Sequence, residues 1–425
     1  MRLWCRNGRR DSLTLEGRVL APAQGIDDCL RITVENGLVA RLEPAPATTP
    51  LVLAPAFVDP HVHLRTPGRE DEETLASGST AAAAGGYCAI LAMPNTDPVV
   101  DSAVVLEGLA RRAAEDAIVP IGFMAAISRG ERGEELTDMA ELADSGAAAF
   151  TDDGQPVVSA GLMRRALQYG ALTGRPLAAH CEDPTLSRNG HAHEGPVATE
   201  LGLGPYPSLA ESLMVERDLM LAESEERPLH LMHLSARESV EALRSAQARG
   251  VQATGEVTPH HLCLTDEAVR TLDPNVKMNP PLRGADDRRA LLEGLLDGTI
   301  AAVATDHAPH ARHEKDVPFE EAPFGVTGLE TAFAALYTRL VLQGLVPLET
   351  LLERMSSGPA RIFGLEEPRI EVGAPANIAV LDLESEWEVT EAGFRSRSAN
   401  SWLLGATLRG RVVKTIADGR VVFES

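Results

Sequence analysis

The sequence lacks several features that mark particular protein classes. Its 425 residues contain no uninterrupted apolar run of 18 or more residues, which argues against a membrane-spanning helix. The first residues, MRLWCRNGRRDSLTLEG, have no apolar core of the kind found in signal peptides, so we expect a cytoplasmic protein. The five cysteines include no Cys-x-x-Cys pair, which argues against a disulfide framework or a structural zinc knuckle.

Positive charge is also scarce. The formal net charge is −23, and non-specific binding of nucleic acid, which needs a basic face, is therefore not expected. Of the 39 basic residues only three are lysine, namely Lys277, Lys315 and Lys414, and the others are arginine. The hydrophobic content of 44% and the charged content of 24% are typical of a soluble globular protein.

The two ends of the chain share one sequence pattern. Both contain short alternating apolar stretches separated by tight-turn signals, such as ENG after RITV and DGR near the C-terminus. This pattern is typical of short antiparallel strands. We therefore predict one small β-sandwich domain that is built from residues 1–54 and 368–425.

Between the ends, eight short apolar runs alternate with amphipathic helical patterns such as DSAVVLEGLARRAAED. Continuous apolar runs are typical of parallel strands that are buried on both faces. Eight alternating units predict a (β/α)8 barrel, which we assign to residues 55–367 as the catalytic domain. The runs are LVLAPAFVD, YCAILAMPN, IVPIGFMAAI, GAAAFTDDG, RPLAAHCED, PLHLMHLSA, VQATGEVTPH and IAAVATDHAPH.

Polar residues end most of these runs, and barrel active sites form where the strands end, so these side chains should converge at one mouth. Imidazole and carboxylate groups together suit zinc and similar ions. The set is too large for one ion and favours two ions that share a carboxylate and a water, as in metal-dependent hydrolysis of an amide. The residues are His61, His63, Asn95, Asp152, Asp153, His180, His233, Asp306, His307 and His310.

Asp152 and Asp153 are rival candidates for the shared carboxylate. Side chains alternate along a strand, so only one of the two can point at the ions. The residues alone leave this choice open. Asp306 has two expected tasks, because a carboxylate at this point can ligate one ion and can also move a proton.

Several motifs of the chain, taken together, closely resemble the dihydroorotases of the amidohydrolase superfamily, in the bacterial long-chain class I type. They are DPHVHLR, MPNT, FTDDGQPV, AAHCED, MHLS, VTPHHL, KMNPPLR, ATDHAPH and APFGVTGLE, and the resemblance covers the whole chain. It implies a zinc-dependent hydrolase that acts on a cyclic amide. The implied reaction is the reversible cyclisation of N-carbamoyl-L-aspartate to L-dihydroorotate and water, in de novo pyrimidine (UMP) biosynthesis.

The resemblance also implies the metal ligands. Many relatives bridge their metals with a carbamylated lysine, but the fourth run, GAAAFTDDG, contains no lysine. The long-chain bacterial class has an aspartate at this position, which matches Asp153, and Asp306 is the implied catalytic residue. The implied ligands are His61, His63 and Asp306 for one zinc ion, His180 and His233 for the other, and Asp153 together with a hydroxide as the bridge.

A second implied set holds the substrate, whose carboxylates call for a cation and amide donors. Arg65 suits bidentate binding of a carboxylate. The segment from His310 to Gly325 is long, charged and irregular, and we expect it to close over the substrate. His260 and His261 are expected to be structural. The implied substrate-binding residues are His63, Arg65, Asn95, Asn279, His310 and the backbone at Phe324 and Gly325.

Two alternatives remain open. A hydantoinase or allantoinase would share the barrel and the His-x-His pair, although these enzymes generally use the carbamylated lysine. A catalytically dead homologue could act as a structural partner of aspartate transcarbamoylase, but such copies have replaced ligand residues. An active enzyme could also form this complex, and we expect a homodimer.

Overall fold

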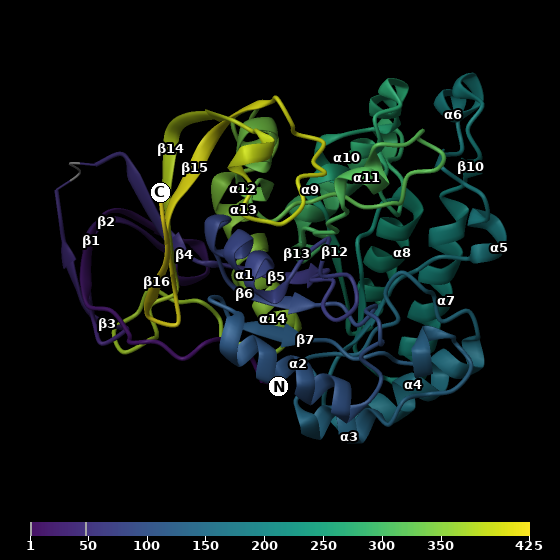
Figure 1. Ribbon diagram of the computed structural model, residues 1–425, viewed down its shortest axis with the longest axis horizontal. Helices are drawn as coiled ribbons and strands as arrows, with labels where there is room; N and C mark the ends of the chain where they lie inside the picture. The colour runs from purple at the N-terminus through teal and green to yellow at the C-terminus, as the bar shows by residue number, and fades with distance from the viewer. Residues whose placement is uncertain (1, 47–48) are drawn as a thin grey trace.

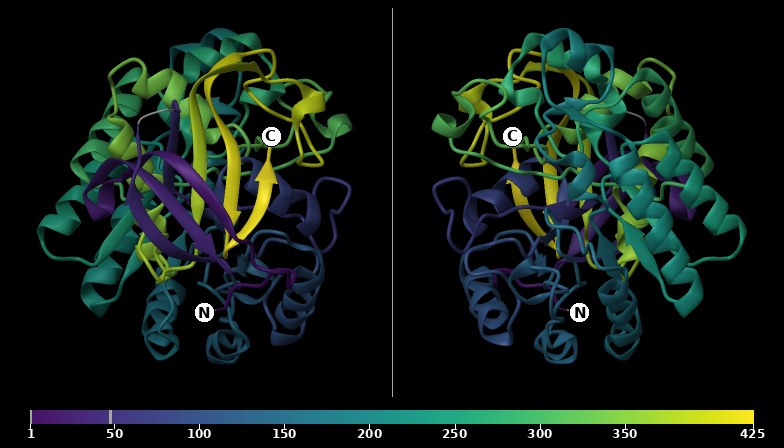
Figure 2. Two further views of the ribbon diagram at one scale, coloured as in Figure 1. Left: turned by 90° about the vertical axis from the view of Figure 1, so that its left-hand side faces the viewer. Right: turned by 90° about the vertical axis from the view of Figure 1, so that its right-hand side faces the viewer.

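The computed structural model describes residues 2–46 and 49–425. A barrel surrounded by helices makes up most of the molecule, and a twisted β-sheet lies at one side of it (Figure 1). The sheet combines strands from both ends of the chain, which Figure 2 shows in purple and yellow. Within the part of the chain that the structure describes, no helix is both long and apolar enough to cross a membrane.

The predicted barrel is confirmed, with its eight positions filled in chain order. Two parallel sheets supply seven of the strands, and Phe150 joins the sheets through parallel bridges to Ala125 and Leu177. The expected fourth strand is thus reduced to one residue, Phe150, which bridges to both neighbouring strands. Val62 pairs with His307 and closes the ring. The strands are β5 (Phe57–Val62), β6 (Tyr87–Ala92), β7 (Ile121–Phe123), β8 (Leu177–Ala179), β11 (Leu229–Leu231), β12 (Ala253–Val257) and β13 (Ala302–Val303).

Helices cover the outside of the barrel, as the amphipathic patterns predict. All residues of β5 and β6 are buried, because helices pack outside them and side chains fill the barrel inside. The longer helices are α1 (Leu75–Ala84), α2 (Ala103–Asp116), α3 (Met139–Ser145), α4 (Ala160–Thr173), α7 (Leu209–Glu225), α8 (Arg237–Ala248), α10 (Ala285–Asp297) and α13 (Leu348–Met355). The shorter ones are α5 (Pro184–Ser187), α6 (Pro196–Leu201), α9 (Pro259–Cys263), α11 (Arg312–Lys315), α12 (Ala332–Leu336) and α14 (Ser357–Ile362).

The small β domain made from both ends is also confirmed. Its sheet has the order β16-β15-β14-β4-β1-β2-β3, and β4 pairs in parallel with β1 and antiparallel with β14. Side chains from both halves of the sheet, including Val19, Ile32, Ile378 and Ile416, pack into one core. The strands are β1 (Leu13–Ala21), β2 (Ile26–Glu35), β3 (Leu38–Pro44), β4 (Leu51–Pro55), β14 (Ile378–Glu388), β15 (Thr407–Ala417) and β16 (Arg420–Glu424). A separate pair, β9 (Ala192–His193) and β10 (Pro205–Tyr206), lies in the connection after β8.

The division into residues 1–54 plus 368–425 and residues 55–367 stays a prediction. Two terminal segments lie against the barrel instead of in the sheet. Trp4 pairs with Ile121 of β7 through two backbone hydrogen bonds of 2.9 Å. The connection between β14 and β15 brings Asn400 to His310, at the end of the barrel where the strands finish.

Candidate active site

The motif FVDPHVHLR forms β5 and the turn after it, and a buried carboxylate ties this strand to its neighbour. Asp59 accepts hydrogen bonds from the backbone N–H of His61 at 3.1 Å and of Thr305 at 3.1 Å, and from the hydroxyl of Thr305 at 2.5 Å. Burial raises the pKa of Asp59 to about 7. These bonds fix the end of β5 beside the segment that carries Asp306.

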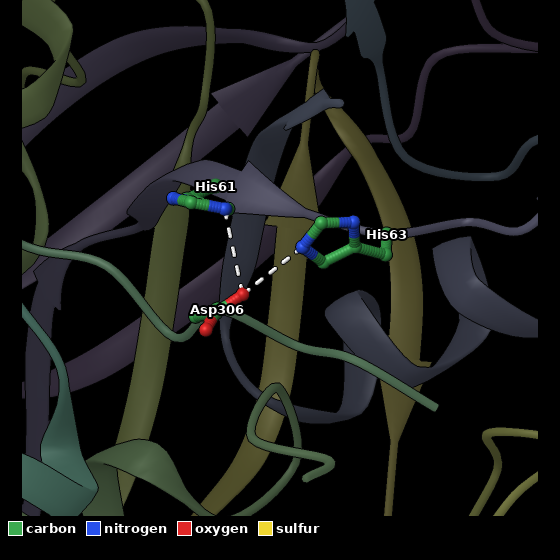
Figure 3. Close-up of side chains that lie close together, drawn as sticks. All are labelled: His61, His63 and Asp306. Carbon is green, nitrogen blue, oxygen red and sulfur yellow. Dashed lines mark hydrogen bonds and ion pairs between the residues drawn. The ribbon is translucent and has the colours of Figure 1, made fainter. Parts of the chain in front are cut away.

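His61, His63 and Asp306 converge at the barrel mouth (Figure 3). The Oδ1 atom of Asp306 lies 3.4 Å from Nε2 of His61 and 3.0 Å from Nε2 of His63. All three side chains are buried, and Asp306 has a positive φ of 47°, a strained backbone conformation that is common at functional sites. Three converging ligand atoms of these types can hold one divalent ion.

Asp153 lies between two pairs of histidines. Its Oδ2 atom is 3.4 Å from Nε2 of both His61 and His63. Its Oδ1 atom is 3.6 Å from Nδ1 of His180 and 3.5 Å from Nε2 of His233. A carboxylate that directs one oxygen at each pair has the arrangement needed to bridge two metal ions.

Asp152, the rival candidate, faces away from the histidines. Its carboxylate accepts hydrogen bonds from the backbone N–H of Ser128 at 2.9 Å and from the Ser128 hydroxyl. Burial raises the pKa of Asp152 to about 6. For Asp153 burial also opposes ionisation, but the nearby histidines, His61 above all, outweigh it and hold the pKa well below its usual range. The structure therefore places Asp153, and not Asp152, among the candidate ligands.

The donor set fits a metal centre. Nε2 of His61 and Oδ1 of Asp153 are buried, and neither atom has a hydrogen-bond partner in the described chain. Each buried group left unpaired costs on the order of 1–3 kcal/mol, which a bound cation would offset. Imidazole nitrogens beside carboxylate oxygens are the ligands that zinc and related ions prefer.

Two buried residues that the sequence analysis did not single out orient this centre. Glu256, on β12, accepts hydrogen bonds from Nδ1 of His61 at 2.8 Å and from Nε2 of His230 at 3.0 Å. Nδ1 of His230 in turn lies 2.8 Å from the hydroxyl of Thr254. Although burial opposes it, the two histidines lower the pKa of Glu256 to about 2. Because Nδ1 of His61 is engaged, its Nε2 remains free for a metal.

Asn279, which is expected to bind the substrate, lies beside the carboxylate of Glu182. Oε2 of Glu182 accepts hydrogen bonds from Nε2 of His180 and from Nδ2 of Asn279, both at 2.9 Å. The hydroxyl of Ser187 donates to the other oxygen of Glu182 at 2.5 Å. Nδ1 of His180 is therefore the nitrogen that faces Asp153, and Oδ1 of Asn279 has no hydrogen-bond partner among the described residues.

Asn95 contacts two of the candidate metal ligands. Its Oδ1 atom accepts a hydrogen bond from Nδ1 of His63 at 3.0 Å, and its Nδ2 atom donates to the backbone carbonyl of Asp153 at 3.2 Å. Asn95 thus orients His63 as Glu256 orients His61. Asn95 and His63 are also expected to hold the substrate, and both lie at the mouth.

Arg65 and His310, also expected to hold the substrate, share a buried partner. Nε of Arg65 lies 2.9 Å from Oε2 of Glu72 and donates to the carbonyl of Pro309 at 3.1 Å. Nε2 of His310 donates to the carbonyl of Phe324 at 2.8 Å, and its Nδ1 faces Oε1 of Glu72 at 3.4 Å. Burial, with the nearby Arg65 charge, lowers the pKa of His310 to about 3, so its imidazole is neutral.

Gly325 is held from both sides. Its N–H donates to the carbonyl of Lys277 at 2.9 Å, and its carbonyl accepts from Nδ2 of Asn400 at 3.2 Å. The φ of Gly325 is 121°, and a Cβ at this position would lie only 2.7 Å from the Cβ of Ala308. Only glycine fits here without strain, and it lets the backbone approach the mouth closely.

His260 and His261 follow β12 in α9. Nδ1 of His261 lies 2.8 Å from the hydroxyl of Thr258, and Nε2 of the same ring donates to the carbonyl of Pro280 at 2.9 Å. Both of its nitrogens are thus occupied, which is the arrangement of a structural histidine. His260 is buried, and Nε2 of its ring has no hydrogen-bond partner in the described chain.

Comparisons with known sequences agree on one family. The family model described as Dihydro-orotase-like matches residues 51–239. A dihydroorotase of Syntrophus aciditrophicus (strain SB) is 44% identical over 418 residues, which cover 96% of this chain and 98% of that protein. A dihydroorotase of Bacillus caldolyticus is 43% identical over 433 residues, which cover 100% and 99%.

Hydantoinases are among the solved structures that share this fold. An L-hydantoinase (dihydropyrimidinase) from Arthrobacter aurescens superimposes with a TM-score of 0.84 at 25% identity, covering 96% of this chain and 94% of that chain. A D-hydantoinase superimposes with a TM-score of 0.80 at 22% identity over the same shares of both chains. The fold is thus shared with these hydantoinases, whereas the identity to the dihydroorotases is about twice as high.

Proposed function

The chain belongs to the dihydroorotase family, and on this premise we propose that its barrel mouth interconverts N-carbamoyl-L-aspartate and L-dihydroorotate in pyrimidine biosynthesis. The matched regions cover 98% and 99% of these two relatives. The position of Asp153 between two histidine pairs, with Asp306 beside one pair, supports this function most directly.

We propose that the centre takes two zinc ions. The unpaired buried atoms of His61 and Asp153 support this assignment, as does the mixed set of nitrogen and oxygen donors. Two such ions, when bound, polarise a carbonyl and make water a strong nucleophile near neutral pH. No carbamylated lysine is part of the proposal, because an aspartate lies between the histidine pairs. The ligands are His61, His63 and Asp306 for one ion, His180 and His233 for the other, and Asp153 with a hydroxide as the bridge.

Asp306 is the proposed proton carrier. In the hydrolytic direction it accepts a proton from the attacking water and delivers it to the leaving ring nitrogen. Burial opposes ionisation of Asp306, but His61 and His63 hold its pKa well below the usual range, so the carboxylate is available as a base. Its Oδ1 atom lies within 3.4 Å of both histidines, which keeps the base beside the site of attack.

A set of residues around the mouth is proposed to hold the free carboxylate and the ureido group of the substrate. Arg65 supplies the positive charge, and its buried ion pair with Glu72 at 2.9 Å fixes the direction of the guanidinium. Asn279 offers a side-chain oxygen that has no partner within the described chain. The full set is His63, Arg65, Asn95, Asn279, His310 and the backbone at Phe324 and Gly325.

The substrate test uses the purified, zinc-loaded protein without any partner. We expect ring opening of L-dihydroorotate and no turnover of hydantoin or allantoin. Turnover of hydantoin or allantoin instead would favour the corresponding cyclic amidohydrolase. No turnover of any of the three compounds, with both metals bound, would favour a structural role beside aspartate transcarbamoylase.

We further propose that the enzyme acts in the cytoplasm as a homodimer and can bind aspartate transcarbamoylase. Light scattering of the purified chain should give the mass of a dimer. Mixing it with purified aspartate transcarbamoylase should give a species of higher mass. A monomer that stays unchanged on mixing would contradict both expectations.

A further inference from the structure

Two of the three lysines of this chain are buried at the segment His310–Gly325: Lys315 lies within this segment and Lys277 lies against it. Lys277 is 2% exposed and Lys315 is 7% exposed, although lysine is rarely buried so fully unless its ammonium group has partners. The third, Lys414, lies on β15 of the small domain and pairs with Glu424 at 2.8 Å. The two buried lysines therefore invite a specific explanation.

Lys315 joins the end of this segment to the connection that follows β12. Its Nζ atom donates to the carbonyl of Pro323 at 2.8 Å and to the carbonyl of Pro274 at 3.0 Å. It also lies 3.5 Å from the carbonyl of Lys277. Pro323 directly precedes Phe324, so Lys315 fixes the backbone beside the proposed substrate-binding peptide.

Lys277 contacts the middle of the same segment. Its Nζ atom donates to the carbonyls of Phe319 at 2.8 Å and Glu320 at 3.0 Å, and it lies 4.8 Å from the ring centroid of Phe324. The backbone carbonyl of Lys277 accepts the N–H of Gly325 at 2.9 Å. Both the side chain and the backbone of Lys277 thus hold this segment.

The chemistry of the ammonium group explains why lysine is used here in a chain whose other basic residues, apart from Lys414, are arginine. An ammonium is compact and directs three donors to separate acceptors, which suits several converging carbonyl oxygens. The planar fork of a guanidinium suits carboxylates and phosphates instead. Because the bonded carbonyls come from the backbone, these contacts fix the course of the segment and not its side chains.

We propose that Lys277 and Lys315 are positioning residues for the substrate, because they hold the segment that carries His310 and Gly325 at the barrel mouth. This inference rests on the proposed function, in which His310 and Gly325 hold the substrate. The hydrogen bonds of the two ammonium groups include none to a proposed metal ligand. Loss of either ammonium group should therefore weaken substrate binding and leave the metal centre intact.

The test compares Lys277→Met and Lys315→Met with Lys414→Met as the matched control. Methionine keeps most of the side-chain length and removes the ammonium group. For both buried positions we expect KM for L-dihydroorotate to rise about tenfold, kcat to change less than about threefold, and zinc content to stay at the wild-type value. Lys414→Met should match the wild type in all three quantities.

Wild-type KM in both buried variants overturns the proposal, and so does a joint loss of kcat and zinc, which would mean general damage to the fold. If the wild type itself fails to open dihydroorotate, the proposed function falls and this inference falls with it. Turnover by the wild type with unchanged KM in the variants overturns only the role of the lysines.

A second measurement on the wild type applies even if the variants do not fold. Acetylation by acetic anhydride, followed by peptide mass spectrometry, reports on each of the three lysines separately. We expect saturating L-dihydroorotate to slow acetylation of Lys277 and Lys315 at least about threefold and to leave Lys414 unchanged. Equal rates at the buried positions with and without dihydroorotate overturn the proposal.

Discussion

Glu256 accepts a hydrogen bond from Nδ1 of His61 at 2.8 Å, at a depth in the barrel where both side chains are almost fully buried. The other oxygen of Glu256 accepts from His230, so the carboxylate is held on both sides. This arrangement fixes the ring of His61 and leaves its Nε2 facing Asp153 and Asp306. The direction of a proposed metal ligand is thus set from the strand β12, on which no ligand lies.

Replacing Glu256 by glutamine should weaken metal binding. Without the charge, His61 is less basic and its tautomer is no longer fixed. Changes of this kind typically cost about 10–100-fold in metal affinity. Competition with a chelator measures the zinc affinity directly. Glu107→Gln, at an exposed position of α2, is the matched control and should bind zinc like the wild type. Equal affinities in the two variants would exclude an orienting role for Glu256.

Replacing Asp306 by asparagine should remove turnover while the fold and at least one metal remain. An amide is nearly isosteric with the carboxylate but cannot accept the proton, and general acid–base groups contribute about 10²–10⁴-fold to rate. Steady-state ring opening of dihydroorotate and zinc content should be measured on the same preparation. Retention of wild-type turnover would exclude Asp306 as the proton carrier.

The two neighbouring aspartates offer a matched pair of variants. Asp153→Asn should lose the second zinc ion and at least about 100-fold in turnover, because an amide is a poor bridge between two cations. Asp152→Asn should keep both ions, since Asp152 bonds to Ser128 and faces away from the histidines. Metal analysis and turnover of both proteins check this. Equal losses in the two variants would mean that the bridge is not assigned to the correct residue.

Glu330 should make stability depend on pH. It accepts hydrogen bonds from the backbone N–H groups of Arg395 at 2.9 Å and Ser396 at 3.0 Å, and burial raises its pKa from 4.5 to about 7. Between these two values the folded state binds a proton that the unfolded chain releases, so stability falls as pH rises through this window.

Glu330→Gln removes this proton linkage. As the pH rises from 4.5 to 7, the free energy of unfolding should therefore fall by about 1–3 kcal/mol less in the variant than in the wild type. Urea unfolding at several pH values measures this difference. Glu115→Gln, at an exposed position of α2, should keep the wild-type slope. An unchanged slope in Glu330→Gln would show that Glu330 does not carry the linkage.

Much of the fold follows from local pattern in the sequence. The eight apolar runs lie where the barrel positions are, because strands that are buried on both faces are mostly apolar. The fourth run forms only two parallel bridges, both at Phe150, two residues before Asp152. A run of apolar residues indicates burial but does not determine how many ladder hydrogen bonds form.

Site residues that lie inside strands, or far along the chain from the residues that they contact, were harder to predict from the sequence. Glu256 and His230 lie within apolar runs, before the strand ends where ligands were sought. The signal that could have identified Glu256 is a carboxylate within the apolar run VQATGEV, because an ionised group is buried only when it has partners. Asn400 bonds to His310 and Gly325 from the connection between β14 and β15, and no local pattern predicts so distant a contact.

A zinc titration of the metal-free protein tests whether two zinc ions joined by Asp153 are needed for turnover. Ring opening of L-dihydroorotate should be followed in buffer freed of carbon dioxide as zinc is added. We expect turnover to appear without bicarbonate and to reach its plateau at two zinc ions per chain, because in the proposed centre Asp153, and not a carbamylated lysine, joins the two sites. A plateau at one ion, or turnover that requires bicarbonate, would contradict it.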